Sequence, residues 1–244
     1  MKNLKNCLMG IEIKEPCFEY LQSELKENYS FGLVIDLFSL PCMQYETRNK
    51  LSIIFALLED RETNDTIISW LTYILTNLSG ELWHEYQERL KSCIEAQFSL
   101  FSRNQLLLLA HTIEIMYAKG YENTFELARV LYQRVPLFNN EFNPDSDDNI
   151  RINLAKIAYS TSQYNFNEKL ASIKAIKVHL KNSGRKYLQG MLNYYKGICL
   201  GAAACRLDYK DDTYYIMKAK LKEFELAYVY LNYRGKNFET SKES

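Results

Sequence analysis

The segment SRNQLLLLAHTIEIMYAK, residues 102–119, carries the strongest helical signal in this sequence of 244 residues. Ser102 and Gln105 have the spacing of a capping box, in which each side chain bonds the backbone N–H of the other residue. The apolar residues that follow cover most of a helical circumference; they are Leu106 to Leu109, Ile113, Ile115 and Met116. We therefore predict a central helix over 105–119 that is buried on more than one side.

Similar start signals precede most of the other expected helices. Capping boxes at 123–126 and 165–168 open two of them, and the first must stop before Pro136. Asparagine or aspartate precedes three more, expected at 66–78, at 149–161 and from about 213 to 233. Shorter helices are expected near 16–27, 31–40 and 43–58. The apolar spacing predicts about ten or eleven helices and no strand.

The composition agrees with an all-α fold. Hydrophobic residues make up 47% and charged residues 25% of the chain, which is enough apolar material for a real core. There are only 9 glycines and 4 prolines, fewer than sheets joined by tight turns require.

Consecutive helices with short links pack as antiparallel hairpins, and stacked hairpins form a solenoid. Two such hairpins resemble each other, 149–161 with 166–182 and 186–207 with 212–233. The expected fold is therefore a TPR-like α-solenoid of antiparallel helix hairpins, and an irregular helical bundle is the alternative. We expect N-terminal helices over 1–62 packed on a helical-repeat domain over 63–234, followed by a flexible tail over 235–244.

The sequence also predicts a cytoplasmic location. No apolar run approaches the roughly 18 residues that suggest a membrane span. Lys2 and Lys5 are followed by an apolar stretch that Glu12 and Lys14 interrupt, so no signal peptide is expected. The six cysteines form no C-x-x-C pair and are expected to be reduced thiols.

The net charge of zero hides an asymmetry. Residues 1–150 carry 13 Lys/Arg against 22 Asp/Glu, a balance of −9, and residues 151–244 carry 17 against 8, a balance of +9. Such a field can steer an anionic ligand or align two copies head to tail, so a homodimer is possible. A basic stripe over 169–186 fits nucleic acid phosphates or a solvated helix face; it comprises Lys169, Lys174, Lys177, His179, Lys181, Arg185 and Lys186.

Metal-binding and catalytic motifs are incomplete. The D-x-D-x-N sequence at 145–149 lacks the glycine and glutamate of a calcium loop, because Ile150 and Lys156 occupy those positions. Glu81 and His84 have E-x-x-H spacing, but no second copy exists. Neither a G-x-S-x-G motif nor a phosphate-binding glycine loop occurs. We expect no enzyme, no metal and no cofactor.

Four segments carry a family resemblance: QLLLLAHTIEIMY at 105–117, FELARVLYQR at 125–134, NIRINLAKIA at 149–158 and LNYYKGICL at 192–200. Over roughly residues 80–232 they resemble the regulatory half of the Rgg/GadR/MutR regulators, which belong to the Gram-positive peptide-pheromone receptors. The resemblance implies a helical-repeat domain that binds a short peptide on its concave face and usually dimerises. The family normally begins with a helix-turn-helix domain, and residues 1–62 show none, so specific DNA binding by this chain alone is not expected.

The leading functional hypothesis is a peptide- or protein-binding regulatory protein. Asparagine side chains can donate to and accept from an extended peptide backbone, and arginine can bind its carboxylate. The expected peptide-binding residues come from the first helices of the two hairpins: Asn149, Arg151, Asn153, Asn193, Tyr194 and Lys196. A protein–protein scaffold without a small ligand is the first alternative, and a nucleic-acid-binding regulator is the second.

Overall fold

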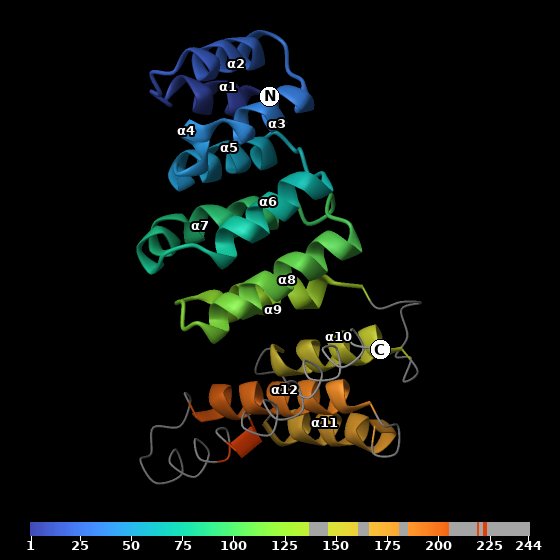
Figure 1. Cartoon of the computed structure of the whole chain (residues 1–244). Helices are drawn as coiled ribbons and strands as arrows, with labels where there is room; N and C mark the ends of the chain where they lie inside the picture. The colour runs from blue at the N-terminus through green and yellow to red at the C-terminus, as the bar shows by residue number, and fades with distance from the viewer. Residues whose placement is uncertain (137–145, 161–165, 181–184, 205–218, 220–221, 224–244) are drawn as a thin grey trace, which may run out of the picture. The chain divides into compact units, whose positions relative to one another are not determined.

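A computed structural model of the chain describes residues 1–136, 146–160, 166–180, 185–204, 219 and 222–223 (Figure 1). The regular structure of this part consists of α-helices in the following order: α1 (Lys2–Met9), α2 (Pro16–Glu27), α3 (Phe31–Ser39), α4 (Pro41–Gln44), α5 (Thr47–Glu59), α6 (Asp65–Thr76), α7 (Gly80–Ala96), α8 (Arg103–Ala118), α9 (Thr124–Arg134), α10 (Asp147–Ala158), α11 (Phe166–Leu180) and α12 (Lys186–Ala204).

The local signals account for several helix starts. Ser102 and Gln105 form the expected capping box of α8, and the Asn64 side chain accepts the N–H of Ile67 at the start of α6. For α10 the cap is Ser146, whose hydroxyl accepts the N–H of Asn149, rather than one of the aspartates that follow it. Pro16 supplies the restricted backbone that suits the first turn of α2.

Two N-terminal details differ from expectation. The helix expected over 43–58 is interrupted at Tyr45 and Glu46, which separate α4 from α5. A second difference is α1, a short helix that buries Leu4 and Leu8 where no helix is expected from the sequence. A helix of this length is marginal alone, so its stability comes from packing on α5.

Internal contacts divide the chain into two compact units, residues 1–127 and 128–244, and the division falls inside α9. The boundary expected at residue 62 lies inside the first unit, because α5 packs on both α6 and α7 across it. The tail expected over 235–244 lies outside the described residues.

Within the first unit, α5 and α7 run in the same direction. Arg48 near the start of α5 pairs with Glu85 of α7 at 2.9 Å. Glu59 at the end of α5 pairs with Arg89, one turn further along α7, at 3.0 Å. The order of contacts is the same along both helices, so α6, which lies between them in sequence, reverses the chain.

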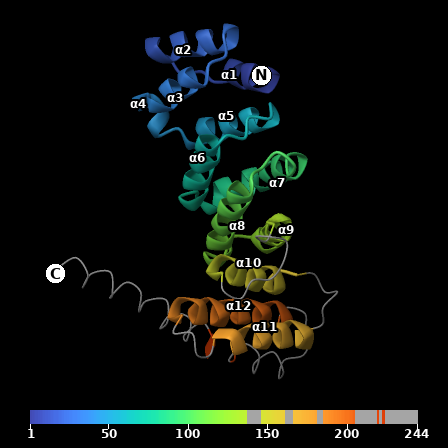
Figure 2. The same cartoon turned by 90° about the vertical axis from the view of Figure 1, so that its right-hand side faces the viewer.

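Helices α6 and α8 also run in the same direction, and they form the most extensive helix pair of the first unit. The Gln105 amide donates to Thr63 O at 2.6 Å and to Asp65 Oδ1 at 2.7 Å, which joins the two helix starts. At the other ends of the helices, Lys119 Nζ, directly after α8, donates at 2.6 Å to the carbonyl oxygen of Thr76, the last residue of α6. These two helices lie on one side and α7 on the other (Figure 2).

The second unit packs α10, α11 and α12 against one another, with α10 and α12 in the closest association. Arg185, which precedes α12, pairs with Asp147 at the start of α10 at 3.4 Å, so these helices begin side by side. Tyr132 and Tyr159 are fully buried and stack with ring centroids 5.4 Å apart. The last expected helix, near 213–233, lies outside the described residues except at 219, 222 and 223.

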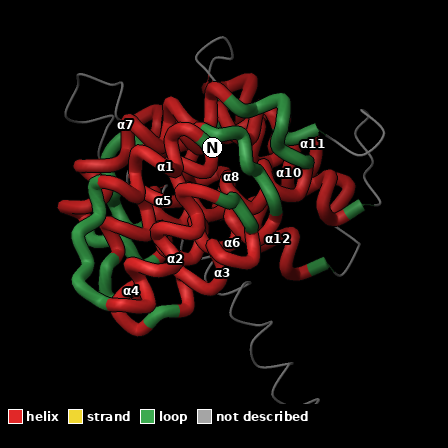
Figure 3. Tube along the Cα trace, turned by 90° about the horizontal axis from the view of Figure 1, so that it is seen from above, coloured by secondary structure: helices red, strands yellow, loops and turns green. Residues whose placement is uncertain are grey.

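No strand occurs in the part of the chain that the structure describes (Figure 3). The all-α class is therefore confirmed. Among the described helices, none combines the length and the apolar character needed to cross a bilayer.

Candidate functional site

One exposed stripe runs the length of α8 and is mainly apolar. Its members are spaced by four and three residues: Asn104, Leu108, Ile115 and Ala118 are exposed, and His111 between them is half-buried. Leu108 is 41% exposed and Ile115 is 46% exposed. The opposite arc of α8 buries Leu106, Leu109, Ile113 and Met116. Some of the apolar residues around α8 are therefore not buried by packing within the first unit.

The neighbouring helix α6 continues this surface. Ser69, Tyr73 and Asn77 form its exposed stripe, and Tyr73 is 73% exposed. Helices α6 and α8 are parallel neighbours (Figure 2), and each carries an exposed stripe. We name the set Ser69, Tyr73, Leu108, His111 and Ile115 the α6–α8 surface. It offers a phenol ring and two aliphatic side chains to solvent.

A pocket of about 510 Å³ lies where α7 begins and where the loop after α8 passes it. Its lining residues are Gly80, Trp83, His84, Lys119, Gly120, Tyr121 and Glu122. The Trp83 and Tyr121 rings meet edge to face, with centroids 6.3 Å apart. Lys119 lines the pocket and also follows the last turn of α8, so the pocket lies next to one end of the α6–α8 surface.

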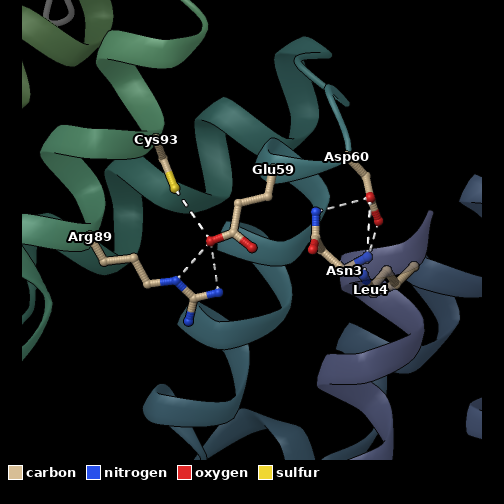
Figure 4. Close-up of polar contacts among 6 residues, drawn as sticks. All are labelled: Asn3, Leu4, Glu59, Asp60, Arg89 and Cys93. Atoms are coloured by element: carbon tan, nitrogen blue, oxygen red, sulfur yellow. Dashed lines mark hydrogen bonds and ion pairs between the residues drawn. The ribbon is translucent and has the colours of Figure 1, made fainter.

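A polar network joins α5 to α7 away from this pocket (Figure 4). Glu59 Oε1 accepts from Arg89 Nε at 3.0 Å and from Cys93 Sγ at 3.7 Å. The Arg89 guanidinium also lies over the Phe55 ring, 5.3 Å from its centroid. Burial raises the pKa of Cys93 to about 11, the Glu59 carboxylate adds to the increase, and Arg89 opposes it. The thiol therefore stays protonated at neutral pH and is a poor nucleophile, so this network is structural.

The asparagines proposed for peptide binding are largely inaccessible. Asn149 is completely buried, Asn193 is 9% exposed, and Asn153 is half-buried. They lie on α10 and α12, which are packed neighbours, so the structure brings their helices together. Burial of Asn149 and Asn193 fits an internal role, because a buried amide needs hydrogen-bond partners inside the protein. Their peptide-binding role stays a prediction.

The other three expected peptide-binding residues are half-buried. The Tyr194 ring packs edge to face on Tyr195 with centroids 5.3 Å apart. Lys196 forms an ion pair with Glu223. Arg151 lies on α10 between two buried residues, Ile150 and Ile152. None of these positions is an open, charged ligand site, and their role in binding also stays a prediction.

The basic stripe is shorter than the sequence implied. Lys169 is buried and donates to Ser160 O at 2.8 Å, so it belongs to the packing of the second unit. Lys174, Lys177 and Lys186 are exposed. Arg185 pairs with Asp147. Nothing is described for Lys181 or for the side chain of His179.

No cluster of three or more potential metal-ligating side chains occurs within the described ranges. The E-x-x-H pair lies at the start of α7, where Glu81 is exposed and His84 lines the pocket. A polar contact at 3.4 Å joins His84 Nδ1 to Gln87 Nε2. The E-x-x-H spacing does not reveal the residues around His84, some of which come from the loop after α8.

Comparison with protein-family models, curated proteins and solved structures finds no match to this chain. The similarity to the Rgg/GadR/MutR regulators therefore remains a hypothesis that rests on the four sequence segments.

Proposed function

We propose that this chain is a polypeptide-binding regulatory protein that holds an apolar segment of its partner on the α6–α8 surface. The observation that carries the proposal is the exposure of Leu108 and Ile115 on one stripe of α8. Single exposed apolar residues are ordinary on protein surfaces. A stripe with a neighbouring exposed tyrosine is different, because grouped apolar residues on adjacent helices commonly mark interaction sites.

The helix arrangement supports this proposal. In the first unit α5 and α7 run parallel, as do α6 and α8, with sequential helices reversing between them. In the second unit α10 and α12 begin side by side. Alternation of this kind is what a TPR-like solenoid requires, and we propose that architecture for the chain. Stacked repeats of this type present alternate helices to one binding face.

The chemistry of the surface favours a partner with apolar side chains at helical spacing. An amphipathic helix meets such a groove through anchors at positions i, i+3 or i+4 and i+7. Leu108 and Ile115 are seven residues apart, so they match two turns of a bound helix. A regulatory role of this kind, resembling that of a peptide sensor, agrees with the cytoplasmic location and the homodimer suggested by the sequence.

The scaffold alternative uses the same surface to hold a folded protein. The nucleic-acid alternative has less support, because Lys169 is buried and Arg185 is paired. We therefore place polypeptide binding first.

Selection from a displayed library of random peptides of about 15 residues tests the proposal. The full chain should enrich sequences with apolar residues three, four or seven apart. The double variant Leu108→Glu/Ile115→Glu should enrich none of them, because each carboxylate would be desolvated on contact. The matched control is Val178→Glu, at a 73% exposed apolar residue of α11, and it should select the same peptides as the wild type.

Two results would count against the proposal. One is equal enrichment by the wild type and the Leu108→Glu/Ile115→Glu variant, which would place peptide binding elsewhere. The other is loss of binding by the α11 control as well, which would show a general charge effect. Circular dichroism of each variant verifies that the helices are retained.

A further inference from the structure

We propose that the pocket between the start of α7 and the loop after α8 binds an apolar or aromatic group that carries a carboxylate. This is a second site, independent of the α6–α8 surface. A free aromatic acid and the C-terminal residue of a polypeptide both present this chemistry. The volume of about 510 Å³ lies in the usual range of small-ligand sites.

Polar and apolar atoms contribute about equally to the lining of the pocket, and the apolar part includes two aromatic rings, Trp83 and Tyr121. Trp83 Nε1 already donates to Glu122 O at 2.8 Å. The Tyr121 hydroxyl donates to Leu78 O at 2.5 Å. With its hydroxyl engaged inside the protein, the half-buried Tyr121 ring offers carbon atoms to an aromatic or aliphatic group. Trp83 is 3% exposed, so it adds only a small apolar area to the lining.

Two nitrogen donors line the same pocket. Lys119 Nζ donates one hydrogen bond to Thr76 O, and its other two N–H groups are available to a ligand. Asn123 Nδ2 donates to Gln87 Oε1 at 3.0 Å, which turns the Gln87 amide nitrogen toward His84 Nδ1. If the Gln87 amide donates to His84 Nδ1, the neutral imidazole carries its proton on Nε2, and His84 is then a second donor. A carboxylate accepts from both, and a charged lysine strengthens its hydrogen bond.

Two glycines leave room for the ligand. A Cβ atom at Gly80 would meet only Tyr121 Cε1, at 4.0 Å, and one at Gly120 would meet nothing within 4 Å. Gly120 has a φ of +84°, a conformation that other residues rarely adopt. The exposed Glu122 is the one acidic residue in the lining, so it should oppose an anionic ligand without closing the site.

Indole N–H resonances provide the readout, because the chain has two tryptophans and only Trp83 lines the pocket. Trp70 stacks on Phe38 at 4.5 Å and serves as an internal control. The probe is N-acetyl-L-phenylalanine, and N-acetyl-L-phenylalaninamide is the same molecule without the charge. The acid should shift the Trp83 signal saturably, leave Trp70 unchanged, and bind at least tenfold more tightly than the amide.

Substitutions distinguish the contribution of the nitrogen donors to ligand binding from that of the apolar lining. Lys119→Met should weaken acid binding at least tenfold and leave amide binding nearly unchanged. Lys174→Met, at an exposed lysine of α11, should change neither. Glu122→Gln should bind the acid as tightly as the wild type or more tightly. An unchanged Trp70 signal in each variant shows that the fold is retained.

A tripeptide ending in phenylalanine identifies the source of the ligand. Tighter binding of its free carboxylate form than of N-acetyl-L-phenylalanine assigns the site to polypeptide C-termini, and equal binding assigns it to small acids. Equal affinity for acid and amide would overturn the proposal, as would a Trp83 signal that does not move at millimolar acid. Retained acid binding in a folded Lys119→Met variant would also overturn it.

Discussion

Asp60 shows how a single carboxylate fixes the first helix of the chain. It follows α5 and accepts the backbone N–H groups of Asn3 at 3.1 Å and Leu4 at 2.9 Å (Figure 4). These groups lie in the first turn of α1, where N–H donors have no partner inside the helix. Burial alone would raise the pKa of Asp60, but the hydrogen bonds from Leu4 and Asn3 and the ammonium of Met1, 3.0 Å away, together outweigh it, so the pKa is lowered.

Replacing Asp60 by Ala should lower the free energy of unfolding by about 2 kcal/mol, through loss of these charge-assisted bonds. The pKa is lower in the folded state, so the contribution of Asp60 is complete above the unfolded value of about 4. It is lost as the pH falls through the folded pKa. Urea unfolding at pH 7 and at pH 3 measures the loss of unfolding free energy in the variant and its pH dependence. The difference in unfolding free energy between wild type and variant should be smaller at pH 3 than at pH 7. Asp36→Ala, at an exposed residue of α3, is the control, and an equal loss there would contradict this role.

The buried asparagines of the second unit allow a second test. Asn149→Ala and Asn193→Ala should each destabilise the fold by about 1–3 kcal/mol, because each strands a buried hydrogen-bond partner. Asn153→Ala, at a half-buried residue on α10, should cost less. Thermal unfolding of the three variants measures this. Unchanged melting of the Asn149 and Asn193 variants, with loss of peptide binding, would restore these residues as a ligand site.

At the scale of elements, the Gln105 side chain makes two kinds of hydrogen bond. It completes the capping box of α8, and its amide nitrogen joins α8 to Thr63 and Asp65 beside α6. Ser102→Ala removes only the cap and should cost about 1 kcal/mol. Gln105→Ala removes the cap and both links, so it should cost about 2–3 kcal/mol. Chemical denaturation compares the two, with Asn104→Ala as the exposed neighbour; equal costs for Ser102 and Gln105 would show that the links contribute nothing.

Local sequence patterns predicted where helices begin better than they predicted which helices pack together. The capping box of α8 is local chemistry between residues three apart, and it forms as expected. The interruption at Tyr45 and Glu46 and the short helix α1 depend on packing against α5, which a local pattern does not contain. Helix α8 was predicted in part, because the sequence showed that apolar residues cover most of its circumference. Which of its apolar residues stay exposed depends on how α8 packs against other helices, α6 among them.

The candidate sites show the same limit. The sequence selected Asn149 and Asn193 by their position among apolar residues, and that position accounts equally for their burial. Leu108 and Ile115 are the opposite case, because they are apolar residues that lie on the exposed side of α8. The pocket could not be found in this way, because Trp83 and Tyr121 are distant in sequence and meet only when α7 packs beside the loop after α8.

At the scale of the whole molecule, the two units carry opposite charge. Residues 1–127 hold 11 Lys/Arg against 18 Asp/Glu, a balance of −7, and residues 128–244 hold 19 against 12, a balance of +7. Of the basic stripe, three described residues are exposed lysines, Lys174, Lys177 and Lys186. They can contact phosphates, but they supply no base-reading element.

We therefore predict no sequence-specific binding of duplex DNA by this chain alone. Non-specific binding through about three lysines should weaken roughly 40-fold between about 50 and 200 mM salt, because counterion release governs it. Fluorescence anisotropy with a labelled random duplex measures this dependence. Selective binding of one promoter fragment at about 150 mM salt would contradict it.

The central claim is that the α6–α8 surface binds polypeptide, and calorimetric titration of a library-selected peptide tests it most directly. Burial of apolar area predicts a negative heat-capacity change on binding. Loss of the two aliphatic contacts, about 3 kcal/mol together, predicts an affinity roughly 100-fold weaker for Leu108→Glu/Ile115→Glu than for the wild type. The Val178→Glu control should bind like the wild type. Equal dissociation constants for the wild type and the folded double variant would contradict the claim.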